Sequence, residues 1–280
     1  MSGKTAVLFL AHKWDLFTRL KYQRLFDEIG DEAPLVLLIQ SSDDVLRALS
    51  VHPTANHSVA VFDPQVLPQV LGYPYLNGDS LLPGSNHFPV LAWFRDRPDI
   101  ESCLVIEYDV EFSGNWSGLL LELIAAEPDF AALHFRKLRD DPKWRWWSSL
   151  LPAPGELGWI FARRRLRRSF NPIYFISRKA IELIDAAHAR GWRGHHEGLF
   201  ATVLGRSGCR LVDLAELGGF CPGSEQDLRS GLPVAELSTM RWRPEVESTE
   251  FLERSTGRTL FHPVKRGWLF DGKQVVCLDE

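Results

Sequence analysis

Short runs of consecutive apolar residues recur through the first half of the chain, and they limit the folds that it can adopt. These runs are residues 6–11 (AVLFLA), 35–39 (LVLLI), 59–62 (VAVF) and 102–106 (SCLVI). A strand that is buried on both faces has this composition, because neither of its faces meets water. Stretches of helical periodicity separate the runs, and such alternation predicts a mostly parallel sheet with helices on both sides.

The first helical stretch, residues 16–29, places its apolar residues on one face. That face is predicted to contain Leu16, Leu20, Leu25, Phe26 and Ile29. Further helices are expected at residues 43–49, 88–97, 118–126, 179–189 and 197–204. Ser177 is placed to cap the helix at residues 179–189. Further strands are expected at residues 130–135, 173–176 and 210–214. Residues 71–86, residues 140–168 and the tail after Leu217 are rich in turn formers or lack a clear period, so they are predicted to be irregular.

The composition fits one soluble α/β domain of 280 residues, with 45% hydrophobic and 24% charged residues. A net charge of −4 argues against a dedicated nucleic-acid binder. No apolar stretch reaches the roughly 18 residues of a membrane span. The N-terminal apolar run is too short for a signal peptide, and none of the four cysteines forms a C-x-x-C pair. We therefore expect a cytoplasmic protein with reduced thiols.

An acidic motif directly follows the fourth apolar run. Glu107 and Asp109 are two residues apart, so in an extended chain both side chains lie on one side. Ligands of open α/β sheets bind beyond the carboxyl ends of strands. Two carboxylates there can hold Mg²⁺ or Mn²⁺, which neutralises a diphosphate. The alternative is a solvated acidic turn.

A second candidate is Glu197, in the segment GHHEG at the start of a predicted helix. It is either a general base toward a hydroxyl or a carboxylate that stabilises the helix terminus. The adjacent residues His195 and His196 are not expected to face the same way on a helix, which excludes a paired zinc site.

A third candidate is His262, which lies in a turn-like part of the tail. It is either an ordinary surface or core histidine or a ligand that completes a metal site with Asp109. Lys265, three residues on, could neutralise phosphate.

Tryptophan and arginine are concentrated between residues 144 and 168. Neighbouring Trp144, Trp146 and Trp147 cannot share one helical face, so some should be exposed or cover a cleft. Indole rings stack on sugars, and guanidinium groups bind phosphate or carboxylate. The stretch also contains Trp159, Arg163, Arg164, Arg165, Arg167 and Arg168. These arginines suit an anionic acceptor or peripheral contact with a membrane, and the alternatives are a packing lid and a solvated helix face.

The order of these motifs resembles the GT-A glycosyltransferases that use nucleotide sugars, especially the fringe-like and galactosyltransferase-type groups. The resemblance covers most of residues 5–265. It combines an N-terminal αβα half, a strand ending in E-Y-D where those families have D-x-D, a segment N-P-I-Y-F-I-S-R (residues 171–178) that leads into a helix, an acid at Glu197, and a late histidine.

The resemblance implies roles for six residues. Asp109 and His262 would ligate Mn²⁺ or Mg²⁺, and Glu197 matches the position of the catalytic acid in inverting members. The residues that the resemblance implies in binding the nucleotide donor are His12, Asp15 and Glu107, and Lys265 joins them as the residue expected to neutralise phosphate.

The resemblance also implies one GT-A-like domain, with a nucleotide-binding half (1–115) and an acceptor-binding half with the tail (116–280). The expected reaction is metal-assisted transfer of a sugar from a nucleotide sugar, with a UDP-sugar as the expected donor, to a carbohydrate or glycolipid. Bacterial surface-glycan or polysaccharide synthesis is the expected setting.

Two alternatives stay open. One is a metal-dependent hydrolase of phosphoesters or acylated sugars that uses Asp109, His195, Glu197 and His262. The other is a non-catalytic carbohydrate-binding protein.

Overall fold

The fold is described here from a computed structural model of the chain. It covers residues 4–54, 58–156, 165–218, 220–221, 233–255, 257–265 and 267–278.

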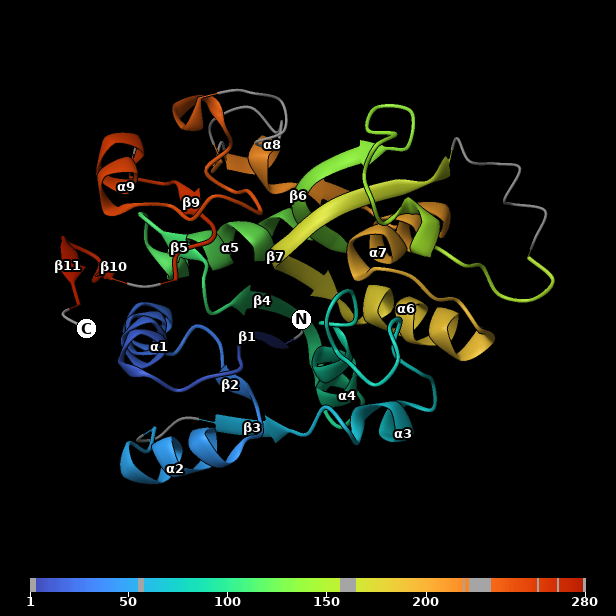
Figure 1. Ribbon diagram of the computed structural model, residues 1–280, viewed down its shortest axis with the longest axis horizontal. Helices are drawn as coiled ribbons and strands as arrows, with labels where there is room; N and C mark the ends of the chain where they lie inside the picture. Colours follow the sequence, from blue (N-terminus) through green and yellow to red (C-terminus); the bar gives the residue numbers. More distant parts are fainter. Residues whose placement is uncertain are drawn as a thin grey trace.

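A seven-stranded sheet forms the centre of the molecule (Figure 1). Its strands are β1 (Lys4–Ala11), β2 (Leu35–Gln40), β3 (Ser58–Phe62), β4 (Ile100–Glu107), β6 (Phe130–Lys137), β7 (Arg167–Ser177) and β8 (Leu211–Asp213). They lie in the order β3-β2-β1-β4-β7-β6-β8. The first four in this order are parallel, as are β6 and β8, whereas β7 is antiparallel to both of its neighbours. The prediction of a mostly parallel α/β sheet is confirmed, and the arrangement is Rossmann-like.

Helices cover both faces of this sheet, as predicted. They are α1 (Leu16–Ile29), α2 (Asp43–Val51), α3 (Leu67–Leu71), α4 (Phe88–Arg95), α5 (Trp116–Ala126), α6 (Arg178–Arg190), α7 (His196–Arg206), α8 (Leu214–Gly218) and α9 (Ser248–Arg254). One apolar cluster joins α4, α6 and α7 to the sheet, and a second joins α1 and α5 to its other face. The predicted cap is present, because the Ser177 side chain accepts a hydrogen bond from the N–H of Ala180.

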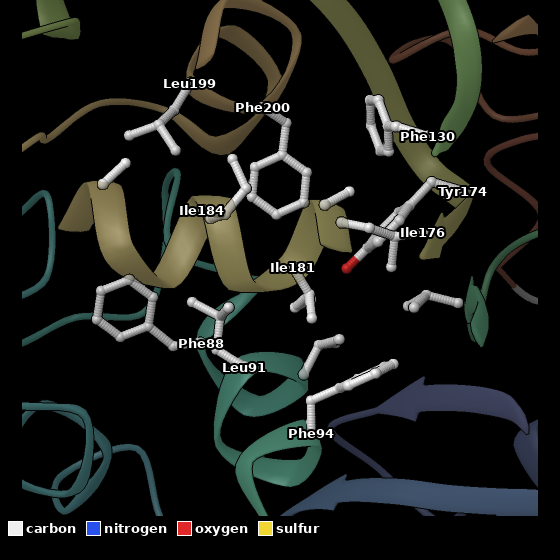
Figure 2. Packing of buried hydrophobic residues seen from close by; sticks show 14 of the residues in the cluster. Phe88, Leu91, Phe94, Phe130, Tyr174, Ile176, Ile181, Ile184, Leu199 and Phe200 are labelled. Carbon is white, nitrogen blue, oxygen red and sulfur yellow. The ribbon is translucent and has the colours of Figure 1, made fainter. Parts of the chain in front are cut away.

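The first apolar cluster contains a dense group of aromatic and branched side chains (Figure 2). Phe200 from α7 packs against Phe130 and Tyr174 of the sheet, with ring centroids 5.6 and 5.9 Å away. Phe88 from α4 and Ile184 from α6 are also fully buried in this cluster. This packing fixes α7, and therefore the N-terminal turn that contains Glu197, against the sheet.

Helix α1 has the predicted bounds, but its predicted buried face is only partly correct. Leu25 and Ile29 are buried as predicted. Leu16 and Leu20 are exposed, whereas Lys21 and Arg24 are buried. The reason is a carboxylate that lies far along the chain. Glu111 is buried beneath α1, with Oε1 2.6 Å from Nη1 of Arg24 and Oε2 3.5 Å from Nζ of Lys21. Buried charges of opposite sign therefore outweigh the apolar pattern of the helix.

Other segments contain more regular structure than predicted. Helix α3 precedes the predicted loop, and β7 begins at Arg167, inside the stretch expected to be irregular. The tail contains α9 and three short strands, β9 (Leu260–Phe261), β10 (Trp268–Phe270) and β11 (Val275–Cys277). Of these, β9 pairs with β5 (Glu111–Phe112), and β10 pairs with β11. Such two- and three-residue strands depend on their partner for stability, so a local pattern does not reveal them.

All four cysteines, Cys103, Cys209, Cys221 and Cys277, are free thiols.

Glu111→Ala is expected to lower the free energy of unfolding by about 3–5 kcal/mol. It leaves Lys21 buried without its ion-pair partner and leaves Arg24 with Glu28 as its remaining carboxylate. Urea unfolding followed by circular dichroism measures this loss. The control is Glu122→Ala, which removes the acid of an exposed ion pair with Arg258 and should change stability little. Equal stability of the two variants would contradict a structural role for the buried network.

Candidate functional site

The candidate site lies where the strand order of the sheet reverses. Strands β2 and β3 continue from one side of β1, and the chain then returns to place β4 on its other side. The carboxyl ends of β1 and β4 meet there, with Leu10 paired to Glu107. Ligands of open α/β sheets bind in the crevice at such a switch point.

Two carboxylates and one imidazole converge at this point. Glu107 ends β4, Asp109 follows in a tight turn, and His262 arrives from the tail immediately after β9. One potential ligand atom from each of the three lies within 4.8 Å of the others. Asp109 and His262 are both 6% exposed. The structure thus brings together Asp109 and His262, the metal ligands that the resemblance implies, and Glu107, whose carboxylate was expected to hold a cation with that of Asp109.

His262 is oriented by a hydrogen bond on the far side of its ring. Its Nδ1 lies 2.7 Å from the carbonyl oxygen of Arg241, and since a carbonyl can only accept, Nδ1 is the donor. The other nitrogen, Nε2, lies 3.4 Å from Oδ1 of Asp109. A backbone carbonyl that fixes one imidazole nitrogen while the other faces a metal is the usual support of a metal-binding histidine.

Burial and charge together shift the pKa values of these three groups. Burial and the neighbouring Asp109 raise the pKa of Glu107 to about 7. Burial opposes ionisation of Asp109, but His262 and the lysines Lys21 and Lys265 outweigh it and lower its pKa. Burial also opposes a charged His262, yet Asp109 and Glu107 hold its pKa above the ordinary value. The cluster therefore favours bound positive charge.

The residues present fit a hard divalent cation. Oxygen donors with an imidazole suit Mg²⁺ or Mn²⁺. Oδ1 of Asp109 is buried and has no hydrogen-bond partner among the described residues, and a cation would satisfy it. Oε1 of Glu107 accepts a hydrogen bond from Nδ2 of Asn86, 3.3 Å away, which holds this carboxylate in place. The sequence analysis missed Asn86, which lies in a loop without a recognisable motif.

The predicted nucleotide-binding residues His12 and Asp15 follow β1. The ring of His12 lies edge-on to Tyr108, with centroids 4.8 Å apart. Burial and the adjacent Lys13 lower the pKa of His12. Asp15 caps α1 by accepting hydrogen bonds from the N–H and hydroxyl of Thr18, and its second oxygen lies 2.9 Å from Nζ of Lys13. These contacts account for the presence of an aspartate at position 15 without any role in binding a ligand.

Two lysines add positive charge to the cluster. Lys265 is half-buried and has no ion-pair partner in the described part of the chain, and its charge acts on Glu107, Asp109 and His12. Lys21 is buried and donates to the carbonyl of Val110 at 2.9 Å. The sequence analysis missed Lys21 because its helical position suggested a solvent-facing side chain.

Glu197 lies in the first turn of α7 and is electrostatically coupled to the cluster. Burial raises its pKa to about 7, against the effects of Arg168 and of a hydrogen bond with the backbone of Asn171. The charges of Glu107 and His262 also act on this carboxyl. A side chain that exchanges a proton near neutral pH suits a general base.

His195 and His196 face each other, contrary to the prediction for adjacent histidines on a helix. His195 is the N-cap residue and lies outside the helical turn, so the two rings stack at 4.9 Å with an interplanar angle of 21°. Burial lowers the pKa of both rings, which keeps them neutral. Nδ1 of His195 lies 3.6 Å from Oε2 of Glu197.

The tryptophan-rich segment packs onto this end of α7. Trp144, Trp146 and Trp147 are all half-buried. Trp144 lies so close to Gly198 that an added Cβ there would come within 3.0 Å of the indole, which explains a glycine next to Glu197. Trp146 stacks on His195 with ring centroids 4.9 Å apart. The prediction of tryptophans that cover a site is consistent with these contacts.

The predicted arginine run is only partly described, since Trp159, Arg163 and Arg164 lie outside the described residues. Arg165 is exposed, whereas Arg168 is half-buried and lies 2.6 Å from a carboxylate oxygen of Asp141. The described arginines therefore do not form one solvated face. The charge of Arg168 instead lowers the pKa of Glu197, against the effect of burial. Within the described ranges, no helix has the length and apolarity needed to cross a bilayer.

A hollow of about 350 Å³ lies elsewhere, between β3 and the helices α3 and α4. None of the predicted site residues lines it, and its walls are largely apolar.

Comparisons with known proteins leave the family open. No family model and no curated protein sequence matches the chain. Among solved structures, the chain is similar to a Bacillus anthracis protein assigned as a glucose-1-phosphate thymidylyltransferase and determined in complex with sucrose. The two share 11% identity with a TM-score of 0.43, over 75% of this chain and 85% of that one. The function is therefore inferred from the residues of this chain.

Glu197→Gln is expected to stabilise the protein at about pH 8 and to have little effect near pH 4. The carboxyl has a pKa of about 7 in the folded chain against an ordinary value of 4.5. Its stabilising contribution is complete below the unfolded value and is lost as pH rises through the folded one. Glutamine resembles the protonated form and escapes this loss, which is on the order of 3 kcal/mol. Urea unfolding at both pH values tests the difference, and equal stability at pH 8 would contradict the burial of an ionising carboxyl.

Proposed function

We propose that the chain is a glycosyltransferase that moves a sugar from a nucleoside-diphosphate sugar to an acceptor hydroxyl, assisted by a divalent cation. The observation that carries the proposal is the convergence of Glu107, Asp109 and His262 at the switch point of the sheet. The switch point of an open α/β sheet suits a nucleotide, and oxygen-rich cation ligands beside it suit a diphosphate. Glu197 supplies a titratable carboxyl in the same electrostatic environment.

Glu107, Asp109 and His262 would hold Mn²⁺ or Mg²⁺. When bound, such a cation supplies electrostatic stabilisation of the diphosphate leaving group. Lys265 adds a positive charge beside the carboxylates and is proposed to contact phosphate. His12, next to Tyr108 at the end of β1, is proposed to line the nucleotide site, whereas Asp15 contributes chiefly by capping α1.

Glu197 is proposed to act as the general base. Its carboxylate takes the proton of the acceptor hydroxyl while the acceptor oxygen forms a bond to the anomeric carbon of the sugar. The bond from that carbon to the diphosphate breaks, and its electron pair leaves with the nucleoside diphosphate. His195, whose Nδ1 lies 3.6 Å from Oε2 of Glu197, is neutral and does not compete for the proton.

The hydrolase alternative also uses Asp109, Glu197 and His262, but it requires His195 as a further chemical group. His195 is stacked between Trp146 and His196, and its lowered pKa makes it a poor proton acceptor. The geometry therefore favours transfer. A UDP-sugar donor, a carbohydrate or glycolipid acceptor, a cytoplasmic location and a part in bacterial surface-glycan synthesis stay predictions.

Asp109→Asn and His262→Ala are each expected to weaken Mn²⁺ binding by at least about tenfold, because each removes a proposed ligand. Calorimetric titration of Mn²⁺, with and without UDP, measures this. The control is Asp99→Asn, which alters an exposed carboxylate paired with Lys4. If both site variants bind Mn²⁺ and UDP as the unaltered protein does, the cation site is wrong.

Glu197→Gln should retain UDP and Mn²⁺ binding while turnover of the donor with an acceptor falls by roughly 10²–10⁴-fold, the usual effect of removing a general base. In the unaltered protein, kcat should rise with pH around pH 7, as the carboxyl ionises among Arg168, His195, Glu107 and His262. Release of UDP from a panel of UDP-sugars across this pH range measures both. Full activity in the variant would make Glu197 structural, and turnover of simple phosphoesters alone would favour the hydrolase.

A further inference from the structure

One arginine side chain lies close to two indoles that come from distant parts of the chain. The guanidinium carbon of Arg145 is 4.1 Å from the ring centroid of Trp146 and 5.5 Å from that of Trp242. Trp146 belongs to the segment that covers α7, whereas Trp242 belongs to the tail, close to Arg241 and His262. The arginine therefore connects the two segments that border the candidate site.

Stacking of this kind leaves the hydrogen-bonding edge of the guanidinium unused. Aromatic rings contact its faces, while its five N–H groups point outward in the plane. Arg145 is exposed and has no ion pair or hydrogen bond within the described ranges. Arg24 and Arg241, by contrast, are each bound to a carboxylate. Arg145 is thus an oriented donor group without an acceptor in the described part of the chain.

A second guanidinium lies nearby. That of Arg243 is 5.3 Å from the ring centroid of Trp242, and this side chain also lacks an ion-pair partner among the described residues. Trp242 itself is 58% exposed, so a ligand can reach the group from solvent. Two guanidinium groups on one exposed indole match the chemistry of a carboxylate or phosphate, which they can bind through paired hydrogen bonds.

The same stack leads to the proposed general base. Trp146 lies against His195, and Nδ1 of His195 is 3.6 Å from Oε2 of Glu197. An anion bound at Arg145 would therefore sit beside the residues that border the reacting hydroxyl. This proximity favours a saccharide acceptor over a membrane surface as the source of the anion.

We propose that Arg145, held by Trp146 and Trp242 and assisted by Arg243, binds the carboxylate or phosphate of an acidic saccharide acceptor. This assignment rests on the proposed function, since it takes Glu197 as the base toward that acceptor.

The test measures saccharide binding by calorimetry on the intact protein, with a chelator and without nucleotide. The probes are a glucuronate-containing tetrasaccharide, a phosphorylated tetrasaccharide and a neutral tetrasaccharide of the same length. We expect at least one acidic probe to bind at least about tenfold more tightly than the neutral probe. Arg145→Gln should weaken acidic binding by about 10- to 100-fold, the range for a lost charged hydrogen bond, and leave neutral binding unchanged. Arg145→Lys should also weaken it, because an ammonium lacks the planar fork.

The matched control is Arg47→Gln, which removes an exposed arginine of α2 and should leave acidic binding unchanged. Equal affinity for all three probes, or acidic binding that survives Arg145→Gln, overturns the proposal. Arg145-dependent binding to phosphatidylglycerol vesicles without binding of the tetrasaccharides also overturns it, in favour of a membrane surface. Because the assay contains neither metal nor nucleotide, its failure is separate from a failure of the cation site or of Glu197.

Discussion

The pairing of β5 with β9 is the contact on which the candidate site depends. Residues 111 and 261 are brought side by side, which places His262 next to the turn that contains Asp109. Strands of two residues have little stability of their own. Glu111 of β5 stabilises this pair of strands, because its carboxylate is bound by Lys21 and Arg24 of α1. A helix from the N-terminal part of the chain therefore supports the contact between the acidic turn and the tail.

The buried charged groups around this contact lower the stability of the fold, but they are the groups that form the candidate site. Glu107, Asp109 and Glu197 are three carboxyl groups with little access to water, and desolvation disfavours their charged forms. The fold offsets part of this cost with cations and with the support of His262, but Glu107 and Glu197 retain raised pKa values. Groups whose pKa values are displaced toward neutrality occur often at functional sites, which is consistent with the proposed role of this cluster.

The second half of the chain contributes aromatic side chains that pack next to the candidate site. Packing of Phe200 against the sheet fixes α7, and His195 at the N-cap joins α7 to the tryptophan-rich segment. Arg145 then connects that segment to Trp242 in the tail. The proposed cation site, the proposed general base and the proposed acceptor site are thus held by contacts between residues far apart in the chain. None of these contacts is visible in a local sequence pattern.

The sequence by itself determined most of the longer helices and strands and the position of the acidic motif, but not the short elements of the tail. The continuous apolar runs correctly predicted β1, β2 and β4 as buried strands, whereas β3, at the edge of the sheet, is largely exposed. The bounds of α1 and the Ser177 cap were predicted correctly, because helical periodicity and capping are local properties. Local patterns failed where a distant partner decided the outcome. Lys21 and Arg24 turn inward because Glu111, about 90 residues later, is buried beneath them. His195 and His196 stack because the helix begins only after His195. Only the tertiary structure decided that His262 lies beside the pair Glu107 and Asp109. Desolvation and ion pairing depend on what surrounds a group in space and not on its neighbours in the chain.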